Sequence, residues 1–308
     1  MIYQNILKAA GHTPLIQLNR MTGSNDARVL VKFEGINVGG SIKTRSALRM
    51  IEAAEERGDV GEGSIIVEPT SGNQGIGLAL VGAVKGYKVV IFMPDSVSKE
   101  RLFLLRQYGA DVRLIHDAGD IGECVKECIR EADAMAESNP MVFFPNQFEN
   151  EDNEKAQYEY TAAEIISDMD DSVDAFCSGV GTGGTLTGVG RRLKEVYPDI
   201  RIVACEPEKA CILSGGEVGS HDQMGIGDGI IPGILDQYIY DEIILVSDEE
   251  AIDTAKKLAR LEGILCGISS GSNVFTALKL AERLGKGKTV LTILPDTGER
   301  YFSTPLFK

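Results

Sequence analysis

A lysine beside two glycines is the first feature of this 308-residue sequence with evident chemical potential. It is Lys43, in the segment NVGGSIKTR of residues 37–45, at a predicted helix start. The positive end of a helix dipole opposes a positive charge there, so the pKa of the amine falls toward the nucleophilic neutral form. A solvated surface lysine is the alternative, because most lysines are of that kind. The segment therefore needs support from other sites before it indicates covalent catalysis.

A glycine-rich segment, SGVGTGGT at residues 178–185, is suited to binding phosphate. It lies between the strand-like run VDAFC and the helix-like run LTGVGRRLKEV, where bare N–H groups and the helix dipole converge on an anion. Thr182 and Thr185 add hydroxyl donors. A Walker loop is excluded because its Lys-Ser/Thr pair is absent, and Leu186 occupies the third position of GxGxxG. The alternative is a tight turn that packs a helix on a strand, which needs fewer glycines.

A third segment, EPTSGNQG at residues 68–75, has the residue types of a carboxylate site. It follows the strand-like run SIIV and precedes the helix-like run IGLALVGAV. Hydroxyl, amide and backbone donors at a helix start form an anion nest. An ordinary helix cap is the alternative, but a cap needs one such residue and here four occur in a row. A lysine, a phosphate site and an amino-acid site together are what pyridoxal phosphate (PLP) chemistry requires.

The elements that must position these segments predict an α/β fold. Short apolar runs such as SIIVEP, KVVIFMP and DVRLIH alternate with segments of helical period, a pattern typical of mainly parallel sheets with helices on both faces. The alternation breaks near residues 145–160, which are polar, and then resumes, so we expect two α/β lobes. In such sheets ligands bind beyond the carboxyl ends of the strands. The loops after VEP, CSG, CEP and ILP should therefore line a cleft.

Composition narrows the range of functions. A net charge of −15 and a pI of about 4.7 argue against nucleic acid as a partner. We find no apolar run of about 20 residues and no signal-peptide pattern, so we expect a cytoplasmic protein without a membrane partner. Six cysteines form no CxxC pair, and a disulfide framework is not expected. Cys124 and Cys128 are spaced as two buried helix positions, and we predict no metal site.

The segments together, and in this order, resemble the cysteine synthase (O-acetylserine sulfhydrylase) family of fold-type II PLP enzymes. The resemblance is carried by NVGGSIKTR, EPTSGNQGIGLA, GVGTGGTLTGVG, EGILCGISSGSN and LPDTGERYFST, and it extends from HTPLIQLNR to the last residues. It implies two lobes, each a mainly parallel sheet flanked by helices, as in the tryptophan synthase β subunit. Residues 41–150 would form a smaller, mobile, substrate-side domain. Residues 1–40 and 151–308 would form the larger domain, which binds the PLP phosphate.

The resemblance also implies roles for single residues. Lys43 would form the internal Schiff base and shuttle the α-proton, Asn73 would hydrogen-bond the phenolic oxygen of PLP, and Ser269 of GISSG would face the pyridine nitrogen. A serine hydroxyl does not protonate the ring as a carboxylic acid does, so the ring is a weaker electron sink. The phosphate-binding residues would be Gly181, Thr182, Gly183, Gly184 and Thr185, and the substrate-binding residues would be Thr70, Ser71, Gly72, Gln74 and Gln147.

The implied reaction is a β-replacement in two half reactions. A serine-type amino acid loses its β-substituent to give an enzyme-bound aminoacrylate, and a nucleophile then adds, so ping-pong kinetics are expected. In the family reaction O-acetyl-L-serine and sulfide give L-cysteine and acetate. Binding of the substrate carboxylate would close the smaller lobe and exclude water. The implied partners are an amino-acid substrate and a second copy of the chain in a homodimer.

Several positions depart from the family pattern. Val38 replaces the proline of NPGGSVKDR, and Thr44 replaces its aspartate. Gln74 replaces the threonine of SGNTG, which changes the β-substituent that fits. Asp228 stands in GIGDGIIP where the family has the alanine of GIGAGFIP. Asp228 is either a solvated or cation-paired loop residue or a general base that activates water. The second possibility leads to an alternative function, in which cysteine and water give serine and hydrogen sulfide.

A function of another class also stays open. Family members bind the carboxyl-terminal tail of serine acetyltransferase in the active-site cleft, so the chain could be a catalytically idle binding partner. The presence of Lys43 argues against a purely structural role. Nucleotide binding by the glycine-rich segment ranks last, because the acidic ribose partner and the Walker lysine are not in place.

Overall fold

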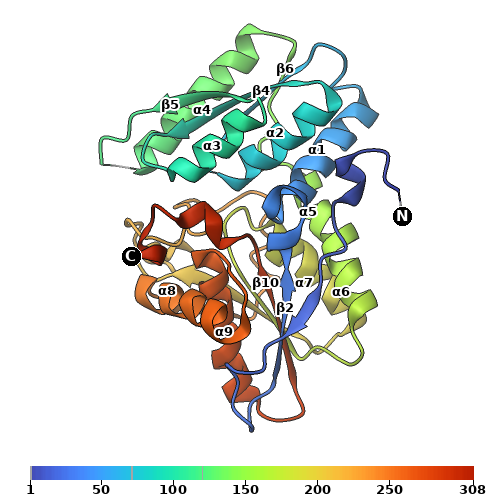
Figure 1. Ribbon diagram of the computed structural model, residues 1–308, viewed down its shortest axis with the longest axis vertical. Helices are drawn as coiled ribbons and strands as arrows, with labels where there is room; N and C mark the ends of the chain where they lie inside the picture. Colours follow the sequence, from blue (N-terminus) through green and yellow to red (C-terminus); the bar gives the residue numbers. More distant parts are fainter. Residues whose placement is uncertain (1, 71, 120) are drawn as a thin grey trace.

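The computed structural model describes residues 2–70, 72–119 and 121–308. The described residues form two parallel-stranded lobes, one above the other in Figure 1. The predicted α/β fold with two sheet-and-helix lobes is therefore confirmed. Among these residues, none of the helices combines the length and apolar character needed to span a bilayer.

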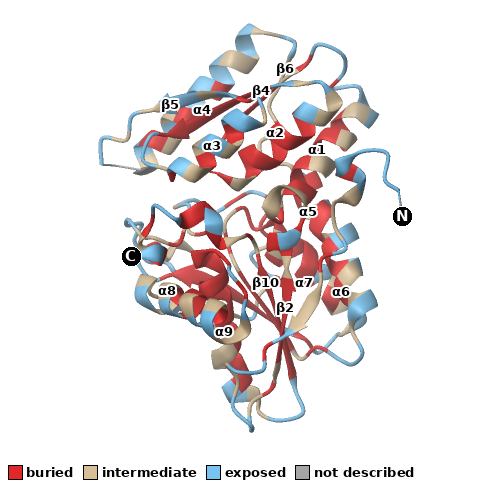
Figure 2. Ribbon diagram, in the orientation of Figure 1, coloured by how far each residue is buried: buried red, intermediate tan, exposed pale blue. Residues whose placement is uncertain are grey.

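The larger sheet of the described chain has six strands, in the order β1-β2-β10-β7-β8-β9. All neighbours are parallel except β1 and β2. Successive residues of β7 face opposite cores: Phe176 packs with α6 and α7, and Cys177 packs with α8 and α9. β7 is buried on both faces, as is its neighbour β10, which is labelled in Figure 2, and this burial explains the continuous apolar sequence. The elements are β1 (Leu15–Gln17), β2 (Arg28–Phe33), β7 (Ala175–Gly179), β8 (Arg201–Pro207), β9 (Glu242–Val246), β10 (Thr289–Leu294), α6 (Ala162–Asp168), α7 (Gly184–Val196), α8 (Asp248–Lys257) and α9 (Ile268–Leu284).

The smaller sheet of the described chain has four parallel strands, in the order β5-β4-β3-β6. Helices α1, α2 and α3 bury one face, and α4 buries the other, where Cys128 packs as a small apolar side chain. The elements are β3 (Ile65–Pro69), β4 (Lys88–Pro94), β5 (Asp111–Ile115), β6 (Val142–Phe143), α1 (Lys43–Arg57), α2 (Asn73–Lys85), α3 (Lys99–Gln107) and α4 (Ile121–Ser138).

The polar segment that interrupts the sequence pattern is helical. It contains α5 (Glu151–Ala156), which continues through a π-helical turn (Gln157–Thr161) into α6. A second π-helical turn (Leu258–Glu262) follows α8. The 3-10 turns are Ile6–Ala9, Glu34–Ile36, Val38–Gly40, Ile212–Ser214, Gly298–Tyr301 and Pro305–Phe307.

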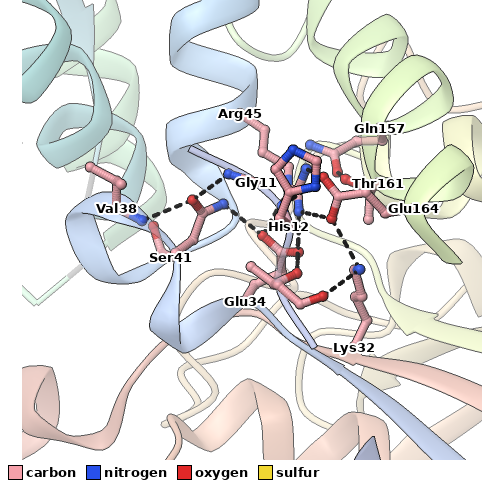
Figure 3. Close-up of polar contacts among 12 residues, drawn as sticks. Gly11, His12, Lys32, Glu34, Val38, Ser41, Arg45, Gln157, Thr161 and Glu164 are labelled. Atoms are coloured by element: carbon pink, nitrogen blue, oxygen red, sulfur yellow. Dashed lines mark hydrogen bonds and ion pairs between the residues drawn. The ribbon is translucent and has the colours of Figure 1, made fainter. Parts of the chain in front are cut away.

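A buried ion-pair network fixes the start of α1 against the larger sheet (Figure 3). Arg45 donates to Glu34 at 2.9 Å and to Glu164 at 2.6 Å, and Lys32 lies 3.0 Å from Glu164. Burial opposes ionisation of Glu164, but its hydrogen bonds with Arg45, Lys32 and the His12 N–H lower its pKa to about 2. Because β2 supplies Lys32 and α6 supplies Glu164, the network holds α1 in place two residues from Lys43.

Candidate active site

One cavity opens between the carboxyl ends of the two sheets and collects the predicted segments. Its wall includes residues at the ends of β3, β4, β7 and β10, as predicted for the loops after VEP, CSG and ILP. From the long connection after β8, residues 224–230 reach the wall. The predicted site residues that line this cavity are Lys43, Thr70, Gly72, Asn73, Gln74, Gln147, Gly181, Thr182, Gly183, Thr185, Asp228 and Ser269.

Two predicted site residues do not belong to that set. Ser71 lies outside the described residues. Gly184 turns away from the cavity, because a Cβ at this position would lie 2.8 Å from Oδ1 of Asn153. Its N–H donates to Thr182 Oγ1 at 3.4 Å, within the turn itself.

Lys43 is the first residue of α1, and it lines the cavity. Burial lowers its pKa from 10.5 to about 8, and the charges of Asp228 and Glu68 oppose the shift. The helix start predicts a pKa lowered by the helix dipole. In the structure the main cause is the burial of the amine away from water. The preceding glycine turn is closed by a hydrogen bond from Thr44 Oγ1 to the Val38 carbonyl. Thr44, a departure from the family pattern, thus shapes the turn that presents the lysine.

The phosphate turn connects β7 to α7. Gly181 approaches the glycine loop of residues 225–229 so closely that a Cβ would overlap the Gly225 carbonyl oxygen. Gly183 has φ +80°, which favours glycine. Thr182 Oγ1 accepts a hydrogen bond from Asn153 Nδ2 at 3.0 Å. The turn therefore offers bare backbone at the N-terminal end of a 13-residue helix, the geometry that binds phosphate.

The carboxylate loop, residues 70–73, connects β3 to α2. Thr70 Oγ1 accepts a hydrogen bond from the Gly72 N–H at 3.2 Å, and α2 begins at Asn73. Gln147 reaches the same cavity from the loop after β6. Its backbone N–H donates to Glu68 Oε1 at 3.1 Å. Both loops thus contribute polar residues to the lining of one cavity.

Glu68 holds the backbone beside Gln147, and it is not among the site residues predicted from the sequence. It is buried at the end of β3, and its second oxygen accepts the Asn146 N–H at 3.0 Å. Burial raises its pKa to about 8, although the two backbone hydrogen bonds and Lys43 oppose the shift. A carboxylate inside the apolar run IIVEP was the available signal, because a buried acid needs partners.

Asn73 connects the two lobes. Its Oδ1 accepts a hydrogen bond from Arg300, and its Nδ2 donates to Asp296 Oδ2 at 2.6 Å. Arg300 also donates to the Gly39 carbonyl, and the Tyr301 hydroxyl donates to Asp296 at 2.8 Å. An amide nitrogen carries two N–H groups, so one remains for a ligand. Asp296, Arg300 and Tyr301 lie in the segment LPDTGERY and are not among the site residues predicted from the sequence.

The remaining predicted residues occupy distinct walls. Ser269, the second residue of α9, is buried at the cavity, and Gln74 accepts a hydrogen bond from Ser46 of α1 at 2.9 Å. Asp228 is exposed to the cavity but enclosed by protein, and this desolvation raises its pKa against the opposing charges of Lys43 and His221. Asp228 therefore lines the same cavity as Lys43, and the charge of each side chain affects the pKa of the other.

An α/β chain with a desolvated lysine between a phosphate turn and a carboxylate loop belongs to the class of enzymes that hold a phosphorylated aldehyde through a lysine. The chain belongs to the pyridoxal-phosphate dependent enzyme family, whose model matches residues 6–296. The residues fit this cofactor: an amine is available for the aldehyde, and the cradle at Gly181, which a Cβ would fill, leaves backbone for the phosphate.

Relatives match the whole length of the chain. It is 49% identical over 304 residues to the cysteine synthase of Staphylococcus aureus (strain Mu50 / ATCC 700699), covering 98% of this chain and 96% of the relative. Among solved structures, an O-ureido-L-serine synthase superposes with a TM-score of 0.95 at 42% identity, covering 100% of this chain and 96% of that one. A hydrogen sulfide-producing enzyme from Fusobacterium nucleatum gives 0.92 at 39% identity, covering 97% of this chain and 100% of that one.

Proposed function

We propose that this chain is a cysteine synthase, which converts O-acetyl-L-serine and sulfide to L-cysteine and acetate. The observation that carries the proposal is the amine of Lys43, with its pKa of about 8, between the phosphate turn and the carboxylate loop. The near-full-length similarity to a cysteine synthase supports the choice of reaction.

Lys43 is the proposed proton carrier. When bound, PLP withdraws electrons from the substrate's Cα and so makes the α-proton acidic. A lysine amine with a pKa of about 8 can accept that proton and later return it near neutral pH. Acetate leaves Cβ in the first half of the reaction, and sulfide forms the new bond to Cβ in the second.

The carboxylate loop would orient the amino acid. The Gly72 and Asn73 backbone at the start of α2 presents N–H groups and the positive end of the helix dipole. Gln147 would add its side-chain amide, and Glu68 fixes the backbone there by accepting the N–H groups of Asn146 and Gln147. The orientation of the substrate thus depends on a buried carboxylate that does not itself touch it.

Ser269 and the phosphate turn would hold the cofactor. Ser269 is buried at the start of α9 and offers a hydroxyl, which donates or accepts a hydrogen bond without adding charge. A neutral partner favours release of a β-substituent over chemistry that needs a long-lived negative charge at Cα.

The test is turnover by the purified holoenzyme. We expect L-cysteine formation from O-acetyl-L-serine and sulfide, with ping-pong kinetics, and loss of more than about 1,000-fold of kcat in Lys43→Ala. Arg106→Met, an exposed change on α3, is the control. Holoenzyme that retains PLP but forms no cysteine would contradict the proposal.

A second function is favoured by one specific observation. Asp228 lines the same cavity as Lys43, and desolvation raises its pKa, so that it could activate water that attacks Cβ in place of sulfide. The net reaction is L-cysteine plus water to L-serine plus hydrogen sulfide. One of the structural relatives is a hydrogen sulfide-producing enzyme from Fusobacterium nucleatum. Full sulfide release from cysteine by Asp228→Ala would contradict this role of Asp228.

We also propose how the protein assembles and where in the cell it lies. We expect a cytoplasmic homodimer in which residues 41–150 move as the smaller domain, and a serine acetyltransferase tail could occupy the same cavity. All six cysteines are free thiols, which accords with a reducing compartment. Sedimentation of the holoenzyme tests the dimer, and competition between a tail peptide and substrate tests the partner.

A further inference from the structure

Three arginines near the active site are almost completely buried, and they differ in their partners. Arg300 is 4% exposed and donates to Asn73 Oδ1 and to the Gly39 carbonyl. Arg45 is 4% exposed and is paired with the carboxylates of Glu34 and Glu164. Arg101, on α3, is 3% exposed and has no ion pair with a carboxylate among the described residues. A buried charge without a counter-charge is costly, so Arg101 requires an explanation.

The N–H groups of Arg101 have weak hydrogen-bond partners or none among the described residues. One terminal N–H group points to the Met224 sulfur at 2.7 Å, and a thioether is a weak acceptor. Nε is buried and has no hydrogen-bond partner in the described part of the chain. The guanidinium lies 4.7 Å from the centre of the Tyr301 ring, which stabilises the cation but accepts no conventional hydrogen bond. The Arg101 guanidinium can therefore still donate hydrogen bonds to an anion.

The position of Arg101 identifies that anion. The side chain packs against the carboxylate loop, because a Cβ on Gly72 would lie 2.6 Å from Arg101 Cδ and 2.7 Å from Nε. Arg101 also lines the cavity that contains Lys43. The phosphate turn belongs to the other lobe and has its own helix terminus, so the carboxylate loop is the nearer anion site.

We propose that Arg101 is a specificity-determining residue that supplies the counter-charge for the α-carboxylate of the amino-acid substrate. This inference rests on the proposed function, in which residues 70–73 hold that carboxylate. Binding brings a negative charge to the loop against which Arg101 packs, and the carboxylate then compensates the buried cation. A neutral carboxamide of similar shape would keep one acceptor oxygen for the loop but would not gain this charge interaction.

The experiment compares two ligands of similar shape, one with a charged carboxylate and one with a neutral carboxamide. Holoenzyme is titrated with L-serine and with L-serinamide, whose carboxamide replaces the carboxylate, and calorimetry gives each Kd. We expect Arg101→Met to weaken L-serine binding by about 10- to 100-fold and L-serinamide binding by less than about twofold. Arg106→Met, on the exposed side of the same helix, should change neither value.

The outcomes separate this inference from the function on which it rests. Equal weakening of both ligands in Arg101→Met, or no weakening of L-serine, would show a merely structural arginine and overturn the inference. A wild-type enzyme that does not prefer L-serine would overturn the carboxylate loop as well. If Arg101→Met loses the cofactor, Arg101→Gln keeps a polar side chain without the charge. An unchanged ratio of the two Kd values in Arg101→Gln would contradict the inference.

Discussion

The phosphate turn and the carboxylate loop both join a parallel strand to a helix, yet they are supported differently. The phosphate turn is held mainly within the larger lobe by close backbone packing, with Gly181 against Gly225 and Gly183 against Leu235. The carboxylate loop is held by side chains that cross between the lobes. Asn73 contacts Asp296 and Arg300, and Arg101 stacks on Tyr301.

The difference suits the two ligands. A cofactor that stays bound through many turnovers needs a fixed cradle, and tight glycine packing provides one. A substrate that must enter and leave needs a loop whose contacts break and form, and single polar contacts between lobes contribute only about 1 kcal/mol each. Substrate binding can therefore be coupled to the relative position of the lobes, whereas the packing that supports the phosphate turn lies mainly within one lobe.

The largest expected effect comes from Arg45→Met, which removes the ion pairs that anchor α1, the helix that presents Lys43. Because Glu34 would stay buried without a counter-charge, keeping only hydrogen bonds from Thr13 and Asn37, we expect the free energy of unfolding to fall by about 3–5 kcal/mol. Chemical denaturation of the apoprotein measures this. Arg49→Met, on the same helix but in more exposed ion pairs, should cost less than about 1 kcal/mol. Equal losses in the two variants would contradict the assigned role of the network.

Gly181→Ala should affect the cofactor side alone. The added methyl group would overlap the Gly225 carbonyl, and overpacking of this kind costs about 1–3 kcal/mol. We expect PLP to dissociate about 10- to 100-fold more readily, as measured by dialysis against a fixed PLP concentration. Gly61→Ala, at an exposed position where an added Cβ would meet no atom within 4 Å, is the matched control. Unchanged PLP retention in Gly181→Ala would remove the distinction between a fixed cradle and a movable loop.

Ser98→Ala should affect the substrate side alone. Ser98 Oγ donates to the Arg300 carbonyl at 3.0 Å, so the change breaks one contact between the lobes. A loss of about 1 kcal/mol predicts a rise of roughly fivefold in KM for O-acetyl-L-serine at unchanged PLP content. The matched control is Ser138→Ala on the exposed face of α4. If PLP content fell while KM stayed constant, the comparison would be reversed.

The smallest effect is a shift in pH dependence. Only the neutral amine of Lys43 attacks an aldehyde, so uptake of PLP by the apoprotein should accelerate as the pH rises through about 8. The charge of Asp228 raises the pKa of Lys43, so Asp228→Asn should move the midpoint to lower pH. Stopped-flow absorbance gives the rates. A midpoint at the free-lysine value of 10.5 would contradict the desolvated amine.

Short-range patterns predicted much of this molecule. Lys43 at a helix start, the phosphate turn and the carboxylate loop each lie within one strand-loop-helix unit, where glycine, hydroxyl residues and hydrophobic period identify the local structure. The contacts between lobes could not be predicted in this way. Asn73 and Arg300 lie 227 positions apart in sequence, and no local pattern brings them together.

The cause of the lysine's low pKa was also inaccessible to sequence reasoning. Burial of Lys43 depends on loops from both lobes, including residues 224–230, whereas the helix start is visible in one segment. Arg101 illustrates the same limit. The run SKERLFLLRQ predicts a helix, but only the assembled fold shows that one of its arginines is buried.

The central claim is that the Lys43 amine bonds to the PLP aldehyde while the phosphate turn holds the phosphate. Reduction of the holoenzyme with borohydride, followed by proteolysis and mass spectrometry, tests it most directly. The account predicts that the reduced cofactor is attached to the peptide containing Lys43, with Nζ as the linked atom. Attachment to a different lysine, or a holoenzyme in which no lysine is modified, would contradict it.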